Sequence, residues 1–281
     1  MPLPFFKQRV LPGESSRLGS ALSGFILLLV VLPILCLVVM SFSASSTLDF
    51  PPPGFSMQWY QAAWATFVSP DKNDVLSMGE ALSTSLLVAV QTMLLTTLVA
   101  VPASYALTRG SFRGKALVTQ LVALPMVFPM VVLGLSLLLV FEQLPLNLGI
   151  GRLVIAHVIL ALPFAVKNCT AALLGVGVDM EEAAQMLGAR PLRAAVDVVV
   201  PLMRSGILAG MLLAFIISFN EFTVTYFLYS VDVVTLPIWM FSRTVSSLDP
   251  TVFSFAVVIV LIDFALIWLL ERLVGEGGVS F

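Results

Sequence analysis

The chain has 281 residues, of which 59% are hydrophobic and only 11% are charged, and its mean hydropathy is +1.05. A soluble domain usually carries about 25% charged residues, so this composition excludes an ordinary soluble enzyme and predicts an all-α polytopic membrane protein. The formal net charge of −2 gives no bulk electrostatic basis for binding nucleic acid.

Six apolar stretches reach the roughly 20 residues that a helix needs to cross a bilayer. The predicted spans lie near residues 21–42, 81–108, 116–141, 152–174, 205–229 and 251–273. They form one six-span domain, residues 21–273, between an N-terminal tail (1–20) and a C-terminal tail (274–281). Cys36 and Cys169 both fall inside predicted spans, which favours apolar packing over a disulfide or a metal pair.

The distribution of basic residues predicts the orientation. With the N-terminus inside, both termini are cytoplasmic, and the outer side holds only Lys72, Arg152 and Arg243. The remaining basic residues fall on the cytoplasmic side: Lys7, Arg9, Arg17, Arg109, Arg113, Lys115, Lys167, Arg190, Arg193, Arg204 and Arg272. This bias places the polar loop at residues 175–204 in the cytosol.

The first span and the loop that follows it form the N-terminal part of the bundle. The apolar run of the first span is longer than a signal-peptide core, and Ser43-Ala44-Ser45 is a poor cleavage signal, so we interpret it as a retained span. In the outer loop, the aromatic residues between Met57 and Phe67 predict a helix at the membrane interface, although contact with an external binding protein stays open.

The second and third spans contain residues that are unusual in lipid. Polar side chains such as Gln91 should face other helices or a cavity, which makes Gln91 a candidate for a substrate pathway. Pro125 and Pro129 interrupt the third span, either as a discontinuous helix at a transport site or as a simple packing kink.

The only histidine, His157, lies near the outer end of the fourth span. No Cys, Asp or Glu stands at ligand spacing on that span, so a hydrogen-bonded structural histidine is favoured over a proton or metal site. No metal site and no cofactor are expected.

The loop between the fourth and fifth spans begins like a short amphipathic helix. Asp179 is the predicted N-cap, with Glu182 reaching back to complete a capping box, and Gly188 ends the helix. Its apolar stripe consists of Met180, Ala183 and Leu187. Such a helix either lies on the membrane surface or occupies a groove on a partner protein.

The residues of this loop have a specific spacing. Glu182-Ala183-Ala184, three residues, Gly188, nine residues and then Val198-Val199-Val200-Pro201 resemble the EAA signature of ABC importer permeases, E-A-A-x3-G-x9-I-x-L-P. Val198 and Val200 replace the usual Ile and Leu, which is a mild departure. In that family the EAA loop is a coupling helix that docks in a cleft of the cytosolic ATPase. The resemblance implies a coupling role for Glu181, Glu182, Ala183, Ala184, Leu187, Gly188 and Pro201.

The resemblance extends over nearly the whole chain and is closest to the spermidine/putrescine-type permeases. It implies a MetI-like permease fold in a bacterial inner membrane. It also implies three kinds of partner: a pair of ATPase subunits, a second and related permease subunit, and an extracytoplasmic substrate-binding protein.

The last two spans carry further candidate residues. Gly206, Gly210 and Ala214 form a small-residue stripe for close helix packing. Glu221 lies roughly 24 Å along the fifth span from Ser205, at 1.5 Å per residue, and so in the outer half of the bilayer. It either lines a substrate pathway or bonds to a neighbouring helix, and the same alternatives apply to Asp263 in the sixth span. The candidate pathway residues are Gln91, Ser218, Asn220, Glu221, Thr225, Tyr229 and Asp263.

The chain contains no G-x4-G-K-[ST] phosphate loop, so ATP hydrolysis is expected on a separate subunit and no catalytic residue is assigned. The family resemblance therefore implies the permease subunit of an ABC importer that moves polyamines by alternating access. The alternatives are an ABC permease for another small solute, such as phosphonate, iron or thiamine, and a channel or secondary transporter that needs no ATPase.

Overall fold

A computed structural model describes residues 17–47, 49–68, 77–145, 148–247 and 250–274. Within these ranges the regular elements are all helices, which confirms the predicted all-α class. Most of the two predicted tails lies outside the described residues. The elements are α1 (Arg17–Ser41), α2 (Gln58–Val68), α3 (Met78–Arg109), α4 (Lys115–Ala123), η1 (Leu124–Met126), α5 (Met130–Gln143), α6 (Gly151–Leu174), α7 (Val178–Met186), α8 (Pro191–Ala194), η2 (Ala195–Val199), α9 (Val200–Leu202), α10 (Arg204–Phe219), α11 (Thr223–Leu228), α12 (Leu236–Ser247) and α13 (Thr251–Val274).

Four helices of the described residues are long and apolar enough to cross a membrane, and two bent helix pairs bring the number to six if each pair is one span. The four single spans are Gly19–Ser41, Met78–Arg109, Gly151–Leu174 and Thr251–Leu269. The bent pairs are Lys115–Met126 with Met130–Gln143, at 106°, and Pro191–Leu202 with Arg204–Phe219, at 73°.

Of the two alternatives for the third span, residues 116–141, the structure has the discontinuous helix and not the simple kink. Pro125 and Pro129 lack an N–H and restrict the backbone of the residues before them, so the helix ends in the turn η1 and restarts at Met130. Pro129 has extended backbone angles, φ −57° and ψ 130°, where the chain changes direction. The two halves therefore meet at a sharp angle instead of a mild kink.

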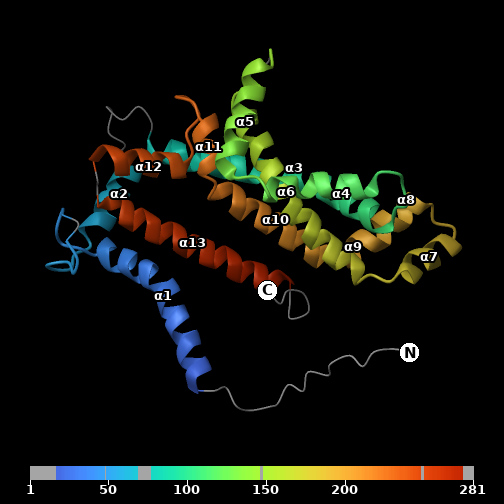
Figure 1. The fold of residues 1–281 in the computed structure, drawn as a ribbon, viewed down its shortest axis with the longest axis horizontal. Helices are drawn as coiled ribbons and strands as arrows, with labels where there is room; N and C mark the ends of the chain where they lie inside the picture. Colours follow the sequence, from blue (N-terminus) through green and yellow to red (C-terminus); the bar gives the residue numbers. More distant parts are fainter. Residues whose placement is uncertain (1–16, 48, 69–76, 146–147, 248–249, 275–281) are drawn as a thin grey trace.

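Three long helices, α3, α6 and α10, pack along one another to form the centre of the bundle (Figure 1). The predicted small-residue stripe on α10 makes this packing close. A Cβ on Gly206 would lie 2.7 Å from the carbonyl oxygen of Asn168, and one on Gly210 would lie 3.3 Å from the Cα of Ala165. The stripe therefore packs against α6, as the sequence predicts.

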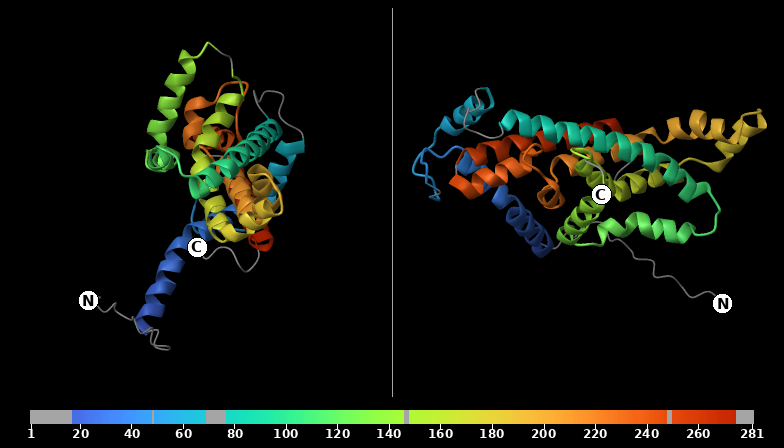
Figure 2. Two further views of the ribbon diagram at one scale, coloured as in Figure 1. Left: turned by 90° about the vertical axis from the view of Figure 1, so that its right-hand side faces the viewer. Right: turned by 90° about the horizontal axis from the view of Figure 1, so that it is seen from above.

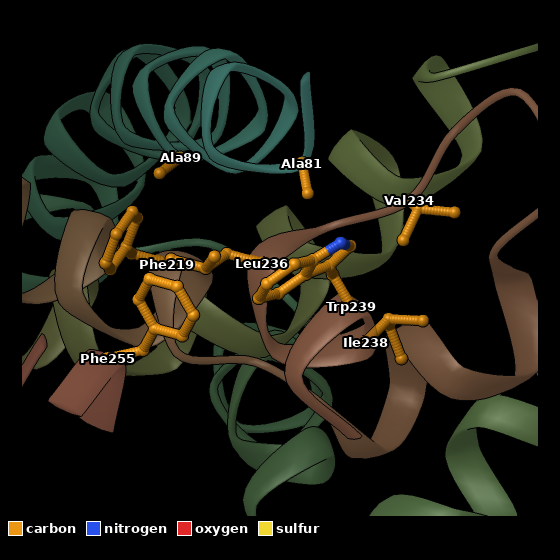
Figure 3. Close-up of a cluster of buried hydrophobic side chains, with 8 residues drawn as sticks. All are labelled: Ala81, Ala89, Phe219, Val234, Leu236, Ile238, Trp239 and Phe255. Atoms are coloured by element: carbon orange, nitrogen blue, oxygen red, sulfur yellow. The ribbon is translucent and has the colours of Figure 1, made fainter. Parts of the chain in front are cut away.

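The elements form an elongated molecule (Figures 1 and 2). Helices α7 and α8 lie at one end, and α2 and α12 lie at the other (Figure 1). A buried apolar cluster near α12 joins α3, α10, α12 and α13 (Figure 3). Its members are Ala81, Ala89, Phe219, Val234, Leu236, Ile238, Trp239 and Phe255.

Helix α1 diverges from this bundle and packs along part of α13 (Figures 1 and 2). Its apolar side chains are exposed; Phe25 and Leu27, for example, are 61% and 65% exposed. An apolar helix with this exposure needs lipid or another apolar protein surface around it.

Candidate functional site: a coupling helix and an intramembrane polar cluster

The helix α7 carries the Glu182-Ala183-Ala184 motif. It begins at Val178 after Gly177, and its N-terminus has no side-chain cap. The predicted capping box of Asp179 and Glu182 is therefore wrong, because the N-cap is Gly177 and the helix begins two residues too early for Asp179 to be the cap. Asp179 and Glu181 lie in the first turn instead, where their charge favours the positive end of the helix dipole.

Gly188 ends this segment in a left-handed conformation, with φ of +93°. The amide of Gly188 donates to the carbonyl of Gln185 at 2.9 Å, and the amide of Ala189 donates to the carbonyl of Ala184 at 3.1 Å. These bonds satisfy carbonyls at the C-terminus of the helix, and a glycine adopts the required backbone angles at little cost. The glycine of the motif is therefore a helix stop, as predicted.

The outward face of α7 is strongly exposed and partly apolar. Leu187 is 90% exposed and Met186 is 88% exposed, while Glu182 and Ala183 are also exposed. A short helix with exposed apolar side chains is a typical docking element, because burial of that surface compensates for its weak intrinsic stability.

Glu181 points the other way. Its side chain is buried and accepts a hydrogen bond from the hydroxyl of Tyr105, while its Oε2 lies 3.8 Å from Nε of Arg109. Arg109 also donates to the carbonyl of Val176 at 2.5 Å. Of the two adjacent glutamates in the motif, only Glu182 is on the exposed face. The placement of Glu181 therefore does not favour the direct ATPase contact that the resemblance implies for it.

The second half of the loop contains a π-helical turn, η2, followed by α9. Pro201 has no N–H to donate to Asp197, the residue four positions earlier, which is consistent with the wider turn at this point. Immediately after α9 the chain bends by 73°, the angle between the segment Pro191–Leu202 and α10. Between this segment and the end of α3 lies an apolar groove of about 700 Å³, lined by residues that include Leu98, Val101, Leu192 and Val196.

The spacing of Ser218, Glu221, Thr225 and Tyr229, at i, i+3, i+7 and i+11, predicts one polar helical face, but the structure does not form it. The fifth span is interrupted at Asn220–Phe222, so Ser218 belongs to α10 and Thr225 to the short helix α11. Glu221 lies in the break, and its Oε1 accepts a hydrogen bond from the amide of Val224 at 2.5 Å. The carboxylate therefore satisfies a free amide at the start of α11.

His157 is fully buried and bonded at both ring nitrogens. Its Nδ1 lies 2.8 Å from Oγ of Ser218, and its Nε2 lies 2.8 Å from Oγ1 of Thr225. The prediction of a hydrogen-bonded structural histidine is confirmed. Ser218 and Thr225 are buried with it, so their geometry assigns them to the packing of α6 against α10 and α11 rather than to an open pathway.

The remaining candidates lie at separate positions. Asn220 donates to Oδ1 of Asp263 at 3.0 Å, which joins the end of α10 to α13. Tyr229 is 43% exposed, and Gln91 is half-buried on α3. Asn220, Glu221 and Asp263 are thus the candidates that gather at the break in the fifth span.

Sequence reasoning missed two groups of residues. Tyr105 and Arg109 were not candidates, although their spacing of four places both side chains on one face at the end of α3. A cavity of about 420 Å³ beside the C-terminus of α5 is lined by Glu142, Arg152 and Asp232. No local sequence pattern indicates this cavity, because its lining residues come from segments that lie far apart in the sequence.

These features define a multi-pass α-helical membrane protein with a short, exposed and partly apolar helix between its fourth and fifth spans. Residues 93–275 match the family described as binding-protein-dependent transport system inner membrane component. The chain belongs to this family and is an inner-membrane permease subunit of an ABC importer, close to the spermidine/putrescine type. A permease of this class works with a separate ATPase and a substrate-binding protein.

Curated relatives are similar over most of the chain. The spermidine/putrescine transport system permease protein PotC of Escherichia coli (strain K12) is 30% identical over 84% of this chain and 86% of that protein. The putrescine transport system permease protein PotI of the same organism is 30% identical over 81% of this chain and 80% of its own length. The molybdenum transport system permease protein ModB of Haemophilus influenzae is 31% identical over 71% of this chain and 98% of its own length.

Two solved structures support the fold. A bacterial ABC transporter involved in the import of the acidic polysaccharide alginate matches with a TM-score of 0.66 and 18% identity, over 92% of this chain and 99% of that one. An amino acid ABC transporter in complex with histidines matches with a TM-score of 0.55 and 17% identity, over 81% of this chain and 98% of that one. At these identities the likeness concerns the fold alone.

Proposed function

We propose that this permease moves polyamines of the spermidine/putrescine type into the cytoplasm. The observation that carries the proposal is the similarity to PotC and PotI, which covers more than four fifths of this chain in both cases. The similarity to ModB covers less of this chain, so molybdenum is the second candidate substrate.

Charge provides an independent argument for a cationic substrate. Glu221 and Asp263 are carboxylates in otherwise apolar membrane segments, and both gather at the break between α10 and α11. Carboxylates in lipid are costly and are usually retained for a substrate, an ion or a polar partner. A polyamine offers several ammonium groups that offset this cost, whereas an anionic substrate would meet repulsion here.

The energy for transport is proposed to enter through α7. The exposed side chains of Met186 and Leu187 supply an apolar surface for a cleft in the ATPase, and Glu182 supplies a charge at its edge. Closure of the ATPase pair would then displace α7 and rock the packed helices α3, α6 and α10 between inward-open and outward-open states.

This proposal requires a defined orientation and a second subunit. The excess of basic residues supports an orientation with both termini and α7 in the cytoplasm. The exposed apolar faces of α1 and α13 offer surface for lipid or for a second, related permease subunit. The substrate-binding protein would deliver the polyamine at the opposite end of the bundle.

Uptake into vesicles tests the proposal. The chain, its permease partner, the ATPase and the binding protein are reconstituted, and entry of labelled spermidine is measured with and without ATP. We expect uptake only with ATP and all subunits, and competition by putrescine but not by a molybdenum salt. Uptake blocked by the molybdenum salt alone would favour the second candidate, and uptake driven by an ion gradient without the ATPase would refute ABC-type transport.

A further inference from the structure

We propose that Tyr105 and Arg109 on α3, together with Glu181 on α7, form the link that transmits displacement of the coupling helix to the membrane-spanning bundle. The inference rests on the proposed docking of α7 on the ATPase and deepens it. It assigns adjacent glutamates to opposite tasks: Glu182 faces the partner, and Glu181 faces the bundle.

The geometry of the three side chains carries the proposal. Oε1 of the Glu181 carboxylate accepts a hydrogen bond from the Tyr105 hydroxyl, and Oε2 lies 3.8 Å from Nε of Arg109, an ion pair without a hydrogen bond. Only 7% of Glu181 is exposed, although it lies on a helix whose other face is open. A hydrogen bond to a charged group that is shielded from water is stronger than one between neutral groups.

Arg109 extends the link to the beginning of the loop. Its guanidinium donates to the carbonyl of Val176, which lies just after α6 ends, while it also faces Glu181. One side chain of α3 therefore contacts both the exit from α6 and the first turn of α7. A displacement of α7 would pull on α3 instead of bending the loop alone.

Within the described residues, the hydrogen bond from Tyr105 to Glu181 and the ion pair of Arg109 with Glu181 are the side-chain contacts that connect α7 to a membrane-spanning helix. The outward residues Met186 and Leu187 are almost fully exposed, so apolar packing holds that part of α7 weakly. The backbone of the loop supplies the remaining connection. The Tyr105–Glu181–Arg109 cluster is thus the specific mechanical contact between the docking element and the bundle.

The helix α3 is suited to carry such a displacement across the membrane. It runs without a break from Met78 to Arg109 and packs along α6 and α10. At its other end, the hydroxyl of Ser85 accepts a hydrogen bond from the amide of Leu236, at the start of α12. Ser85 and Tyr105 are separated by about 30 Å at 1.5 Å per residue, which is about the thickness of the hydrocarbon core.

A structural role alone would make different predictions from a role in transmission. If the cluster only stabilised the loop, its loss would weaken docking of the ATPase and lower all activities together. If it transmits movement, docking and ATP hydrolysis persist while the response of the bundle is lost. The two roles are distinguished by measuring, in the same sample, the association of the ATPase with the permease and the ATP-dependent movement of the bundle.

The experiment uses the full chain assembled with its ATPase and second permease. Cys36 and Cys169 are replaced by Ala, and an environment-sensitive fluorophore is attached at Ser83→Cys, an exposed position near the outer end of α3. The variants are Tyr105→Phe, which removes one hydroxyl, and Glu181→Gln, which removes the charge but keeps the shape. Tyr226→Phe, which removes a hydroxyl from the distant helix α11, is the matched control.

We expect both variants to retain the ATPase on co-purification and to lose most of the ATP-dependent fluorescence change, while Tyr226→Phe keeps it. With the binding protein added, spermidine uptake per ATP hydrolysed should fall about tenfold, the effect expected when a hydrogen bond to a charged group is lost. An undiminished fluorescence response in both variants, or loss of the ATPase in parallel with the response, would overturn the link. Failure of the unmodified chain to bind the ATPase would instead refute the docking on which it rests, and failure of spermidine uptake alone would refute only the substrate.

Discussion

Asn220 donates a hydrogen bond to Oδ1 of Asp263 at 3.0 Å and so joins the end of α10 to α13. The contact gathers a carboxylate and an amide beside the break in the fifth span, where Glu221 caps α11. Asp263 remains half-buried in this arrangement, so its second oxygen is available to another group. This makes Asp263 the residue on which the proposed cation selectivity is tested most directly.

Asp263→Asn should lower polyamine uptake by about tenfold or more, because loss of a charged hydrogen-bond partner costs this much when the site is shielded from water. The side chain keeps its size and its ability to accept from Asn220, so the fold should persist. Uptake of labelled spermidine in vesicles is the measurement. Asp49→Asn, in the outer loop, is the control for loss of one negative charge. Unchanged uptake in Asp263→Asn would contradict a role for this carboxylate in substrate passage.

Glu182→Lys should weaken association with the ATPase while the permease itself stays folded. The side chain is exposed on α7, and its reversal alters the docking surface without disturbing the bundle. Co-purification of the ATPase is the measurement, and Glu142→Lys, an exposed residue at the end of α5, is the control for the same change of charge. Equal recovery of the ATPase with both variants would exclude Glu182 from docking.

His157→Ala should destabilise the chain markedly. The substitution leaves a cavity and removes a shared partner of the buried hydroxyls of Ser218 and Thr225. Unsatisfied buried polar groups cost about 1–3 kcal/mol each, so we expect a clear fall in the thermal unfolding temperature in detergent. Ser218→Ala should have a smaller effect in the same direction, whereas Ser136→Ala, at an exposed position on α5, should have none. If His157→Ala unfolded at the original temperature, the structural assignment would be wrong.

Gly206→Ala should also destabilise the bundle, because the added methyl group would collide with Ala172 and with the backbone of Asn168. Overpacking of this kind typically costs about 1–3 kcal/mol. Gly24→Ala is a matched control, since nothing lies within 4 Å of a Cβ at that position of α1. Thermal unfolding of the two variants compares them directly, and equal stability would show that α6 and α10 are less closely packed than described.

Gly188→Val should weaken the association of α7 with the ATPase, because it strains the backbone at the end of this helix. The left-handed conformation with φ of +93° costs a β-branched residue about 1–2 kcal/mol, so α7 would lose its regular end. We expect less ATPase on co-purification with little change in the stability of the bundle. Gly114→Val is a suitable control, because Gly114 has a φ of +90° in the turn before α4, away from the docking helix. Equal loss of the ATPase in both variants would indicate a general effect of strain.

The sequence by itself determined the membrane class, the apolar segments and the position of the short helix for which we propose a coupling role. These features depend on composition, periodicity and the spacing of nearby residues, which are local properties of the chain. The exposed Glu182-Ala183-Ala184 motif, the stop at Gly188 and the packing of Gly206 and Gly210 all belong to this group. The family resemblance rests on the same short-range pattern.

Only the tertiary structure decided which side chains meet. The bond between Tyr105 and Glu181 joins residues 76 positions apart, and His157 contacts hydroxyls 61 and 68 positions further along the chain. The sequence pattern placed Ser218 and Glu221 on one helical face, but the helix breaks at Asn220–Phe222, and the Glu221 carboxylate there accepts a hydrogen bond from an amide of α11. The partner that each polar side chain bonds depends on which distant groups the fold brings close to it. The spacing of neighbouring residues in the sequence carries no information about those distant groups.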